Sequence, residues 1–438
     1  MCVFEPRSFE RGSTVFMEKI IFHVDVNSAF LSWSAVRRLK EDPSSVDLRT
    51  VPSIVGGDES TRHGIVTAAS IPAKARGIRT AMTVNEAFRL CPGLITVSSD
   101  FTTYREYSRQ FISILHDYTD LVEQASIDEA YMDVSSTKRL YSSLETKDRR
   151  FPLSLAYEVK DRVKKVLGFT VNVGISENCL LAKMASDLEK PDKVHTLFPS
   201  EIEKKMWPLP VRDLFGCGKA TAGKLQSYGI MTIGDAARSD IKFLKKILGE
   251  KAGLYIKESA NGIGRDSLET ERADSKSYSN EITTEKDITA ENFEAEATAI
   301  VERLSESVSK RLKKDAVFGR TVFVSIKTSD FKRHSKQTAL SASTDSKKLI
   351  EDTAMLLLRE LSFDKGRGLL ENGGGYRLIG VGVSGIDHGE NRQLSLFELM
   401  DETNTKKDEE RERRLSELSE LLDKKFGKGV IKRGKDFH

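Results

Sequence analysis

Three acidic side chains lie within otherwise apolar, strand-forming sequence. Asp25 follows the run IIFHV, and the adjacent pair Asp128 and Glu129 stands in the middle of LVEQASIDEAYMDV. An ionised carboxylate in buried surroundings costs several kcal/mol unless it is paired or bound to a metal. For any one of these residues, a place at a strand end that faces water is the simpler interpretation. Three of them in two separate strand segments favour convergence on one site.

Such a site would suit hard divalent cations, because Mg²⁺ takes carboxylate oxygens together with substrate phosphates. Two ions, roughly 4 Å apart, can activate an attacking oxygen and stabilise a leaving one. The carboxylates therefore predict two-metal phosphoryl transfer. Adjacent residues of an ideal strand point to opposite faces, so Asp128 and Glu129 can reach the same ions only if the chain twists or bulges there.

The elements that must position these side chains alternate between strands and helices. Residues 19–26 are short and β-branched, which predicts a strand, and residues 28–40 change to helical spacing with Ser28 as the N-cap. The same signals predict further strand-rich runs at 121–134 and 169–176. Between them, residues 151–168 are predicted to form an amphipathic helix. This mixture predicts α/β or α+β layers.

The composition argues against several other classes of protein. With 438 residues and 39% hydrophobic content, the chain can form about two to four domains. Its four cysteines form no C-x-x-C pair and its histidines do not cluster with them, so neither a zinc site nor a disulfide framework is expected. No stretch approaches the roughly 18 apolar residues of a membrane span, and residues 1–16 lack the apolar core of a signal peptide. The net charge of only +3 excludes neither a nucleic-acid nor a protein partner, because local charged patches matter more than the total.

Four motifs in the first half of the chain are similar to those of Y-family DNA polymerases, in the same order and at the same spacing. They are HVDVNSAF, GIVTAASIPAKARGI, SIDEAYMDV and GISENCLLAKMASDLEKPD. The resemblance runs from about residue 18 to 385 and is closest to the bacterial DNA polymerase IV group. It implies that Asp25, Asp128 and Glu129 are catalytic and bind two Mg²⁺ ions, with help from the carbonyl of Val26.

The same resemblance assigns roles around the nucleotide. Phe30 would be a steric gate that leaves no room for a ribose 2′-hydroxyl, whereas its plain alternative is a core aromatic at the start of a helix. Lys74 and Lys190 would contact the triphosphate. The family pattern A-N-Y-x-A-R is here ASIPAK, so Ile71 replaces a tyrosine and Lys74 an arginine. Isoleucine lacks the hydroxyl donor and lysine lacks the bidentate fork.

Two regions resemble the DNA-holding parts of the family. Residues 214–225 look like a helix-hairpin-helix, in which a glycine turn lets backbone N–H groups approach a phosphate; Gly216, Gly218 and Lys219 are its candidate contacts. Basic residues also gather around later strand-like sequence: Arg311, Lys313, Lys314, Arg320, Lys327, Lys332, Arg333 and Lys336. The candidate DNA contacts among them are Arg320, Lys327, Lys332 and Arg333.

A short apolar motif stands in the polar C-terminal segment. It resembles the clamp-binding peptide of bacterial DNA polymerases and consists of Gln393, Leu394, Ser395, Leu396 and Phe397. Such a peptide fills a preformed pocket with its apolar side chains. The alternative is a short helix that packs back on the domain. The GGDES sequence at 56–60 resembles a cyclase signature but precedes a different motif, and it is interpreted as a turn.

Together these features predict an α+β multidomain fold, a right-hand polymerase with a mixed α/β palm, small fingers, a helix-hairpin-helix thumb and an α/β little finger. The predicted ranges are an N-terminal extension 1–17, palm 18–34 and 94–189, fingers 35–93, thumb 190–264, linker 265–275, little finger 276–386 and a C-terminal tail 387–438. The expected partners are primer–template DNA, deoxynucleoside triphosphates and the sliding clamp (β subunit). A monomer without membrane association, in the bacterial cytoplasm at the nucleoid, is expected.

Three alternatives to a polymerase IV remain open at this stage. A polymerase V-like catalytic subunit shares these motifs. A two-metal nuclease would use similar carboxylates and a helix-hairpin-helix, but it would need neither Phe30 nor a clamp peptide. A non-catalytic scaffold at the clamp would be expected to have lost some of the carboxylates, all of which are present.

Overall fold

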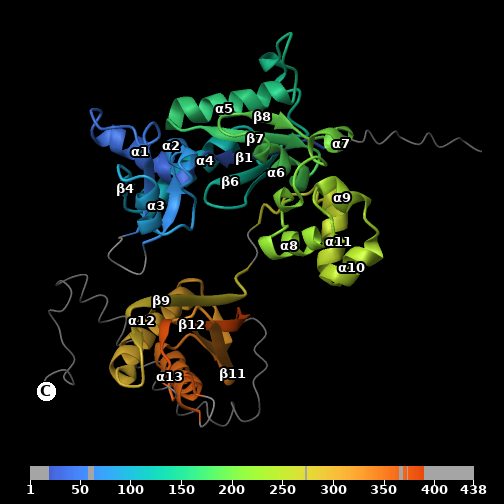
Figure 1. The fold of residues 1–438 in the computed structure, drawn as a ribbon. Helices are drawn as coiled ribbons and strands as arrows, with labels where there is room; N and C mark the ends of the chain where they lie inside the picture. Colours follow the sequence, from blue (N-terminus) through green and yellow to red (C-terminus); the bar gives the residue numbers. More distant parts are fainter. Residues whose placement is uncertain (1–18, 58–63, 272–273, 365–367, 372, 389–438) are drawn as a thin grey trace, which may run out of the picture. The chain divides into compact units, whose positions relative to one another are not determined.

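The computed structural model describes residues 19–57, 64–271, 274–364, 368–371 and 373–388 (Figure 1). Contacts divide the chain into two compact units, residues 1–273 and 274–438. Within the described part of the chain, no helix is both long and apolar enough to cross a membrane. The predicted clamp motif at 393–397 lies outside the described residues.

The first unit is built around a five-stranded sheet with the order β5-β6-β1-β7-β8. Its strands are β1 (Ile21–Val26), β5 (Val122–Gln124), β6 (Glu129–Asp133), β7 (Val171–Ser176) and β8 (Val194–Thr196). All pairs are antiparallel except β7 with β8. The strands predicted at 19–26 and 169–176 are confirmed. The segment predicted at 121–134 contains two short strands joined by a turn.

Side-chain alternation gives this sheet two different faces. On one face, Phe22, Val24 and Val26 join a large apolar core with residues of α4 (Phe101–His116) and α5 (Leu153–Leu167). On the other face, helix α6 (Cys179–Asp187) packs against β1 and β7. Residues 21, 23 and 25 of β1 therefore face α6.

A glycine permits the close approach of α6 to the sheet. A Cβ atom at Gly174 on β7 would lie 2.0 Å from the Ala182 carbonyl oxygen and 2.4 Å from the Ser186 nitrogen. Real Cβ atoms never come so near, and therefore any other residue at this position would push the helix away.

A smaller sheet, with the order β3-β2-β4, packs beside α1 (Ala29–Glu41). Its other elements are β2 (Ser53–Gly56), β3 (Val66–Ala69), α2 (Ile71–Ala75), α3 (Val84–Leu90) and β4 (Ile95–Val97). Strand β4 pairs with β2 and so belongs to this small sheet, although it lies within the palm range predicted from residue 94 onward. Helix α1 also runs without a break through the palm–fingers boundary predicted after residue 34.

The rest of the first unit is helical. Its α-helices are α7 (Ile202–Lys205), α8 (Lys219–Ser227), α9 (Ile233–Arg238), α10 (Ile241–Leu248) and α11 (Glu250–Ala260), and short 3₁₀ turns lie at Ser142–Leu144, Pro199–Glu201 and Val211–Asp213. Strand β8 extends the five-stranded sheet past residue 190, where the thumb was predicted to begin. The first residues of the predicted linker are held on the sheet, because Arg265 donates to both carboxylate oxygens of Glu123.

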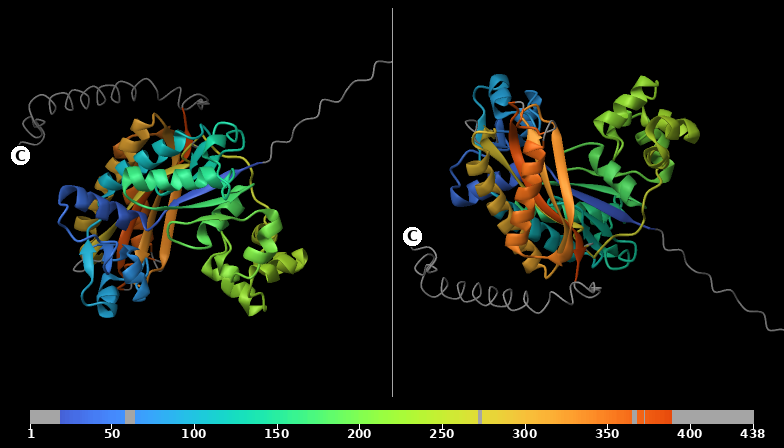
Figure 2. Two further views of the ribbon diagram at one scale, coloured as in Figure 1. Left: turned by 90° about the horizontal axis from the view of Figure 1, so that it is seen from above. Right: turned by 90° about the horizontal axis from the view of Figure 1, so that it is seen from below.

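The second unit is a four-stranded antiparallel sheet with two helices on one face, as Figures 1 and 2 show. In chain order its elements are β9 (Ser277–Ile288), α12 (Phe293–Lys314), β10 (Phe318–Thr328), β11 (Arg333–Thr344), α13 (Lys347–Phe363) and β12 (Tyr376–Asp387). Helix α12 buries one side, which includes Phe293, Val301 and Leu304, while Ile300 is only partly buried. Helix α13 was not predicted.

Candidate active site

The sheet brings the separate acidic segments together at one end of β1. Asp25 and Glu129 are direct partners across the antiparallel pair β1–β6. Asp128 comes just before β6, and its carbonyl oxygen accepts a hydrogen bond of 3.0 Å from the N–H of Val26. Asp25 is buried, while Asp128 and Glu129 are partly exposed.

Asp128 stands in a turn and not in a regular strand. Its carboxylate accepts a hydrogen bond of 2.7 Å from the Ser126 hydroxyl, and its N–H donates to the same oxygen. Because β6 begins only at Glu129, the strict alternation of a strand does not apply to this pair. Two adjacent carboxylates can thus project toward one region.

Two lysines bind the carboxylates directly. Lys183 on α6 places its Nζ 2.6 Å from Glu129 Oε1 and 3.4 Å from Asp25 Oδ2. Lys190, just beyond the helix, places its Nζ 2.8 Å from Asp25 Oδ2. Both ammonium groups also contact Asp187. Two ammonium groups thus contact three carboxylates, those of Asp25, Glu129 and Asp187.

This environment shifts the pKa values of the group. Burial raises the pKa of Asp25 above its ordinary value, although Lys190 and Lys183 oppose that effect. The His23 ring, together with Lys183, lowers the pKa of Glu129. Burial disfavours the charge of Lys183, yet the neighbouring carboxylates raise its pKa overall. Lys183 therefore remains an ammonium group at neutral pH.

His23 lies behind Glu129 on the same face of β1 as Asp25. Its Nδ1 is 2.8 Å from the Ser186 hydroxyl, and its Nε2 is 3.7 Å from Glu129 Oε2, which exceeds a hydrogen-bond distance. Burial lowers the pKa of this histidine, so its ring is neutral near pH 7. His23 and Lys183 were not among the site residues predicted from the sequence. The available signal was the alternate spacing of His23 and Asp25 within one strand.

The donor chemistry of this cluster fits Mg²⁺, although the side chains are not arranged as a metal site. Asp25, Asp128 and Glu129 supply hard carboxylate oxygens, and Val26 ends the same strand. Among the described residues, no three His, Cys, Asp or Glu side chains are grouped to hold a metal ion. The reason is that Asp128 turns to Ser126, while the lysines contact the other two carboxylates.

Phe30 belongs to an aromatic cluster beside this site. Its ring stacks on Tyr104 at a centroid distance of 4.7 Å and contacts Trp33 and Phe101 at 6.0 and 5.9 Å. The ring is only partly buried. Phe30 therefore contributes to packing and also presents an edge to the surroundings.

Ser28 precedes α1 as predicted, but its side chain makes no cap hydrogen bond. Its backbone is left-handed, with φ of 48°, and its hydroxyl accepts a hydrogen bond of 2.8 Å from Lys74 Nζ. Burial, followed by the charges of Lys190 and Arg79, lowers the pKa of Lys74. The positive charge of Lys190, the other predicted triphosphate lysine, thus disfavours the charged form of Lys74. Ile71, at the position of the family tyrosine, is 55% exposed.

The candidate DNA contacts lie on both units. In the first, Gly216 has a positive φ of 81° and Gly218 immediately precedes α8, which begins at Lys219. A Cβ atom at Gly218 would meet no other atom within 4 Å. The turn therefore leaves open space beside the backbone at Gly218.

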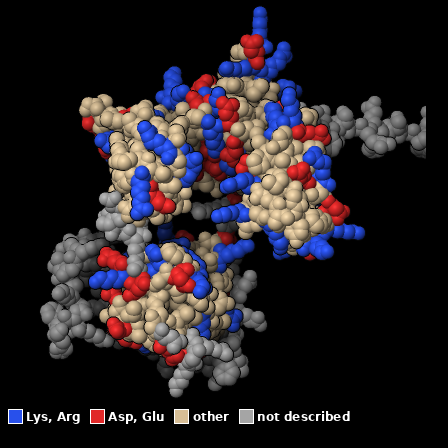
Figure 3. Space-filling model, in the orientation of Figure 1, with Lys and Arg blue, Asp and Glu red and all other residues tan. Residues whose placement is uncertain are grey.

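In the second unit, two of the candidates are paired with acids. Lys332 lies 2.8 Å from Asp330, and Arg333 lies 3.0 Å from Glu281. Lys327 stands 5.7 Å from the ring of Phe331, and Arg320 donates to a backbone carbonyl. In Figure 3, Lys and Arg side chains are interspersed with Asp and Glu on the visible face of each unit. The predicted basic cluster is therefore partly neutralised by nearby acids.

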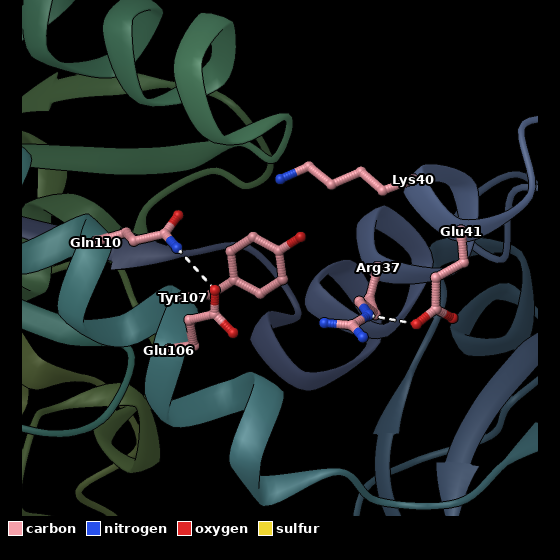
Figure 4. A pocket seen from close by; sticks show the side chains of 6 residues that line it. All are labelled: Arg37, Lys40, Glu41, Glu106, Tyr107 and Gln110. Carbon is pink, nitrogen blue, oxygen red and sulfur yellow. Dashed lines mark hydrogen bonds and ion pairs between the residues drawn. The ribbon is translucent and has the colours of Figure 1, made fainter.

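A shallow pocket of about 180 Å³ lies between α1 and α4, away from the carboxylates (Figure 4). It is lined by Arg37, Lys40, Glu41, Glu106, Tyr107 and Gln110. Arg37 is paired with Glu41, and Gln110 donates to Glu106. None of the predicted site residues lines this pocket.

Comparison with known proteins assigns the whole arrangement to one family. Family models match residues 24–187 (impB/mucB/samB family), 199–230 (IMS family HHH motif) and 275–396 (impB/mucB/samB family C-terminal domain). The chain is 40% identical to DNA polymerase IV of Clostridium acetobutylicum, over 95% of this chain and 98% of that protein. It is 35% identical to DNA polymerase IV 1 of Bacillus subtilis, over 95% of this chain and 92% of that protein.

The chain belongs to the Y family of DNA polymerases. A solved structure described as a Y-family DNA polymerase chimera shares its fold, with a TM-score of 0.67 at 23% identity over 84% of this chain and 99% of the other. The predictions of a Y-family DNA polymerase, its multidomain fold and its helix-hairpin-helix are thereby confirmed, and such a polymerase carries out translesion synthesis. Both of these relatives are named DNA polymerase IV. They therefore favour the polymerase IV group over a polymerase V-like subunit.

The lysine–carboxylate contacts of this Y-family polymerase generate a stability prediction. Lys183→Met would leave Asp25 and Glu129 adjacent without their shared ammonium group, whose side chain is only 9% exposed. We expect the thermal midpoint in EDTA to fall by several degrees, equivalent to about 2 kcal/mol. Calorimetry would measure the midpoint.

Lys193→Met is the matched control. Its ion pair with Glu189 joins side chains that are 48% and 60% exposed, so its loss should change stability by less than about 0.5 kcal/mol. Equal midpoints for the two variants would contradict a neutralising role of Lys183.

Proposed function

We propose that this chain extends a primer 3′-hydroxyl with deoxynucleotides on a DNA template, with low fidelity and across damaged bases, by two-metal phosphoryl transfer. The observation that carries the proposal is the cross-strand pairing of Asp25 with Glu129, with Asp128 next to it. In this assignment the three carboxylates and the Val26 carbonyl hold two Mg²⁺ ions. The ions, when bound, would lower the pKa of the primer hydroxyl and neutralise the triphosphate.

The chain's own residues prepare this site before substrates arrive. Lys183 and Lys190 favour the ionised form of the carboxylates by supplying the opposite charge. Asp128 must turn away from Ser126 to serve as a ligand, which costs only one exposed hydrogen bond. The His23 ring lies next to Glu129, with Nε2 3.7 Å from Oε2.

Lys190 and Lys74 are proposed to contact the triphosphate. The charge of Lys190 opposes the rise in the pKa of Asp25. The charge of Asp25 in turn opposes the fall in the pKa of Lys74. Lysine offers a point charge without the planar fork of arginine, so the orientation of the phosphates depends on how firmly each lysine is held. Lys74 is held by Ser28.

Phe30 is proposed to select deoxyribose. Its ring is fixed by stacking on Tyr104, so a 2′-hydroxyl that met it would find no room and no hydrogen-bond partner. The glycine turn at Gly216 to Lys219 and the basic residues Arg320, Lys327, Lys332 and Arg333 are proposed to bind DNA phosphates. The pairing of Lys332 and Arg333 with acids means that DNA must compete for them.

The segment from Gln393 to Phe397 is proposed to bind the sliding clamp (β subunit), and the enzyme to work as a monomer at the nucleoid in the bacterial cytoplasm. The complete Gln-Leu-Ser-Leu-Phe sequence supports the clamp-binding role. Three apolar side chains in a polar segment gain free energy only if a partner or the chain itself covers them.

Primer extension tests the metal-site assignment. Asp128→Ala should reduce extension at least about a hundredfold and leave DNA binding unchanged, because a lost ligand removes catalytic charge and not phosphate contacts. Asp120→Ala, an exposed acid outside the cluster, is the control. Extension that survives in Asp128→Ala would rule out this assignment, and shortening of the primer by the wild type would indicate a nuclease.

Ribonucleotide incorporation tests the steric gate. Phe30→Ala should lower the preference for dNTP over rNTP at least about tenfold, because the volume next to C2′ becomes accessible. Phe88→Ala removes an aromatic ring from the small-sheet core and should leave this preference unchanged. Single-nucleotide insertion kinetics give both ratios, and an unchanged ratio in Phe30→Ala would remove the role.

Clamp dependence tests the C-terminal motif. The double variant Leu396→Ala, Phe397→Ala should weaken binding to the β clamp at least about tenfold while leaving clamp-free extension unchanged, since two apolar anchors are lost. Leu415→Ala, in the charged segment that follows, is the control. Equal clamp affinity for the wild type and the double variant would refute the assignment.

A further inference from the structure

The loop 189–193, which carries Lys190, is fastened to the sheet by a buried asparagine on β7. Asn172 donates from Nδ2 to the carbonyls of Ser186 (3.0 Å) and Glu189 (2.6 Å). Its Oδ1 accepts from the backbone N–H of Lys193 at 3.3 Å. The side chain is completely buried, so water does not compete for these bonds.

A second buried asparagine, on the adjacent strand segment, completes the fastening. Asn27 donates from Nδ2 to Asn172 Oδ1 at 3.0 Å. Its own Oδ1 accepts from the N–H of Asp192 and from the Thr170 hydroxyl, both at 2.9 Å. Asn172 thus uses all four of its hydrogen-bonding positions, and Asn27 uses three.

These two amides stand next to the carboxylate that Lys190 contacts. Asn172 is the cross-strand partner of Asp25, and Asn27 follows Asp25 by two residues. They fix three backbone groups of the loop, at Glu189, Asp192 and Lys193. Lys190 lies between these anchors, with its Nζ 2.8 Å from Asp25.

The outer side of the loop is anchored independently. The Asp192 carboxylate accepts from Lys160 at 2.9 Å and from Lys164 at 2.7 Å, both on α5. Asp192 also adopts a positive φ of 60°, which aspartate tolerates better than most non-glycine residues. The loop is therefore held from both sides, by the asparagines and by the lysines of α5.

We propose that Asn172 and Asn27 are positioning residues that fix Lys190 for the triphosphate of the incoming nucleotide. The inference rests on the triphosphate role given to Lys190 in the proposed function. A lysine side chain is flexible, so its ammonium group is directed at one position only when its backbone is held. A small displacement of such a group lowers the rate of the reaction or weakens binding. The amide pair supplies that hold without adding charge beside the carboxylates.

A double-mutant cycle tests this inference. Asn172→Ala should raise KM for the correct dNTP about tenfold, with a smaller effect on kcat, in single-nucleotide insertion by the full chain. In the Lys190→Ala background the same substitution should have almost no further effect, because the residue through which it acts is gone. Asn27→Ala should behave alike and serves as the second variant if Asn172→Ala does not fold.

Binding without chemistry provides the second readout. With a dideoxy-terminated primer, the dNTP dissociation constant of Asn172→Ala should rise by the same factor, and again not in the Lys190→Ala background. Asn178→Ser is the control, because Asn178 is another buried amide on the same face, which donates to the Gly262 carbonyl and not to the loop. Its KM and dissociation constant should match those of the wild type.

The outcomes separate the inference from the proposed function. Wild-type KM in both asparagine variants, or effects that simply add to those of Lys190→Ala, would overturn the positioning role. An unchanged KM in Lys190→Ala alone would remove the triphosphate role of Lys190 and the inference with it. Failure of the wild type to extend a primer would refute the proposed function itself.

Discussion

The site depends on a balance between buried like charges and two ammonium groups. Asp25 is buried beside the half-buried Glu129, and burial disfavours the charge of Asp25 unless it is compensated. Lys183 and Lys190 supply the compensating charge in this structure, at 2.6 to 3.4 Å. Divalent cations bound to the same carboxylates would perform the same electrostatic task. In this structure the lysines neutralise the acidic cluster by contacting Asp25 and Glu129 directly.

The remainder of the first unit can be understood as the means of holding that balance. Alternation on β1 sends Phe22 and Val24 into the main core and His23 and Asp25 toward α6. Helix α6 then brings Lys183 onto the acids. The same face carries the amides that hold the loop of Lys190. One face of the sheet thus fixes the relative positions of the carboxylates, Lys183 and the loop that carries Lys190.

Much of this could be predicted from the sequence, because the signals were local. The β-branched run around Asp25 specified a strand, and its carboxylate was conspicuous there. The register of Asp25 against Glu129 was not predictable from local patterns, since it depends on pairing between distant segments. Lys183 looked like an ordinary helix lysine, and Asn172 like a polar residue of a strand. Their roles arise only where α6, β7 and the loop meet. The course of α1, β4 and β8 across the predicted domain boundaries also depends on pairing between distant segments.

Gly174 has a consequence that reaches beyond packing. Because Gly174 has no side chain, α6 packs directly against the backbone of β7. The distance between this helix and the sheet therefore depends on the absence of a Cβ atom at Gly174. A methyl group introduced there would lift Lys183 from Glu129 and Asp25 and would weaken every Coulomb interaction among them. The electrostatics of the acidic cluster can thus be altered by an uncharged substitution behind it, in a residue that touches no substrate.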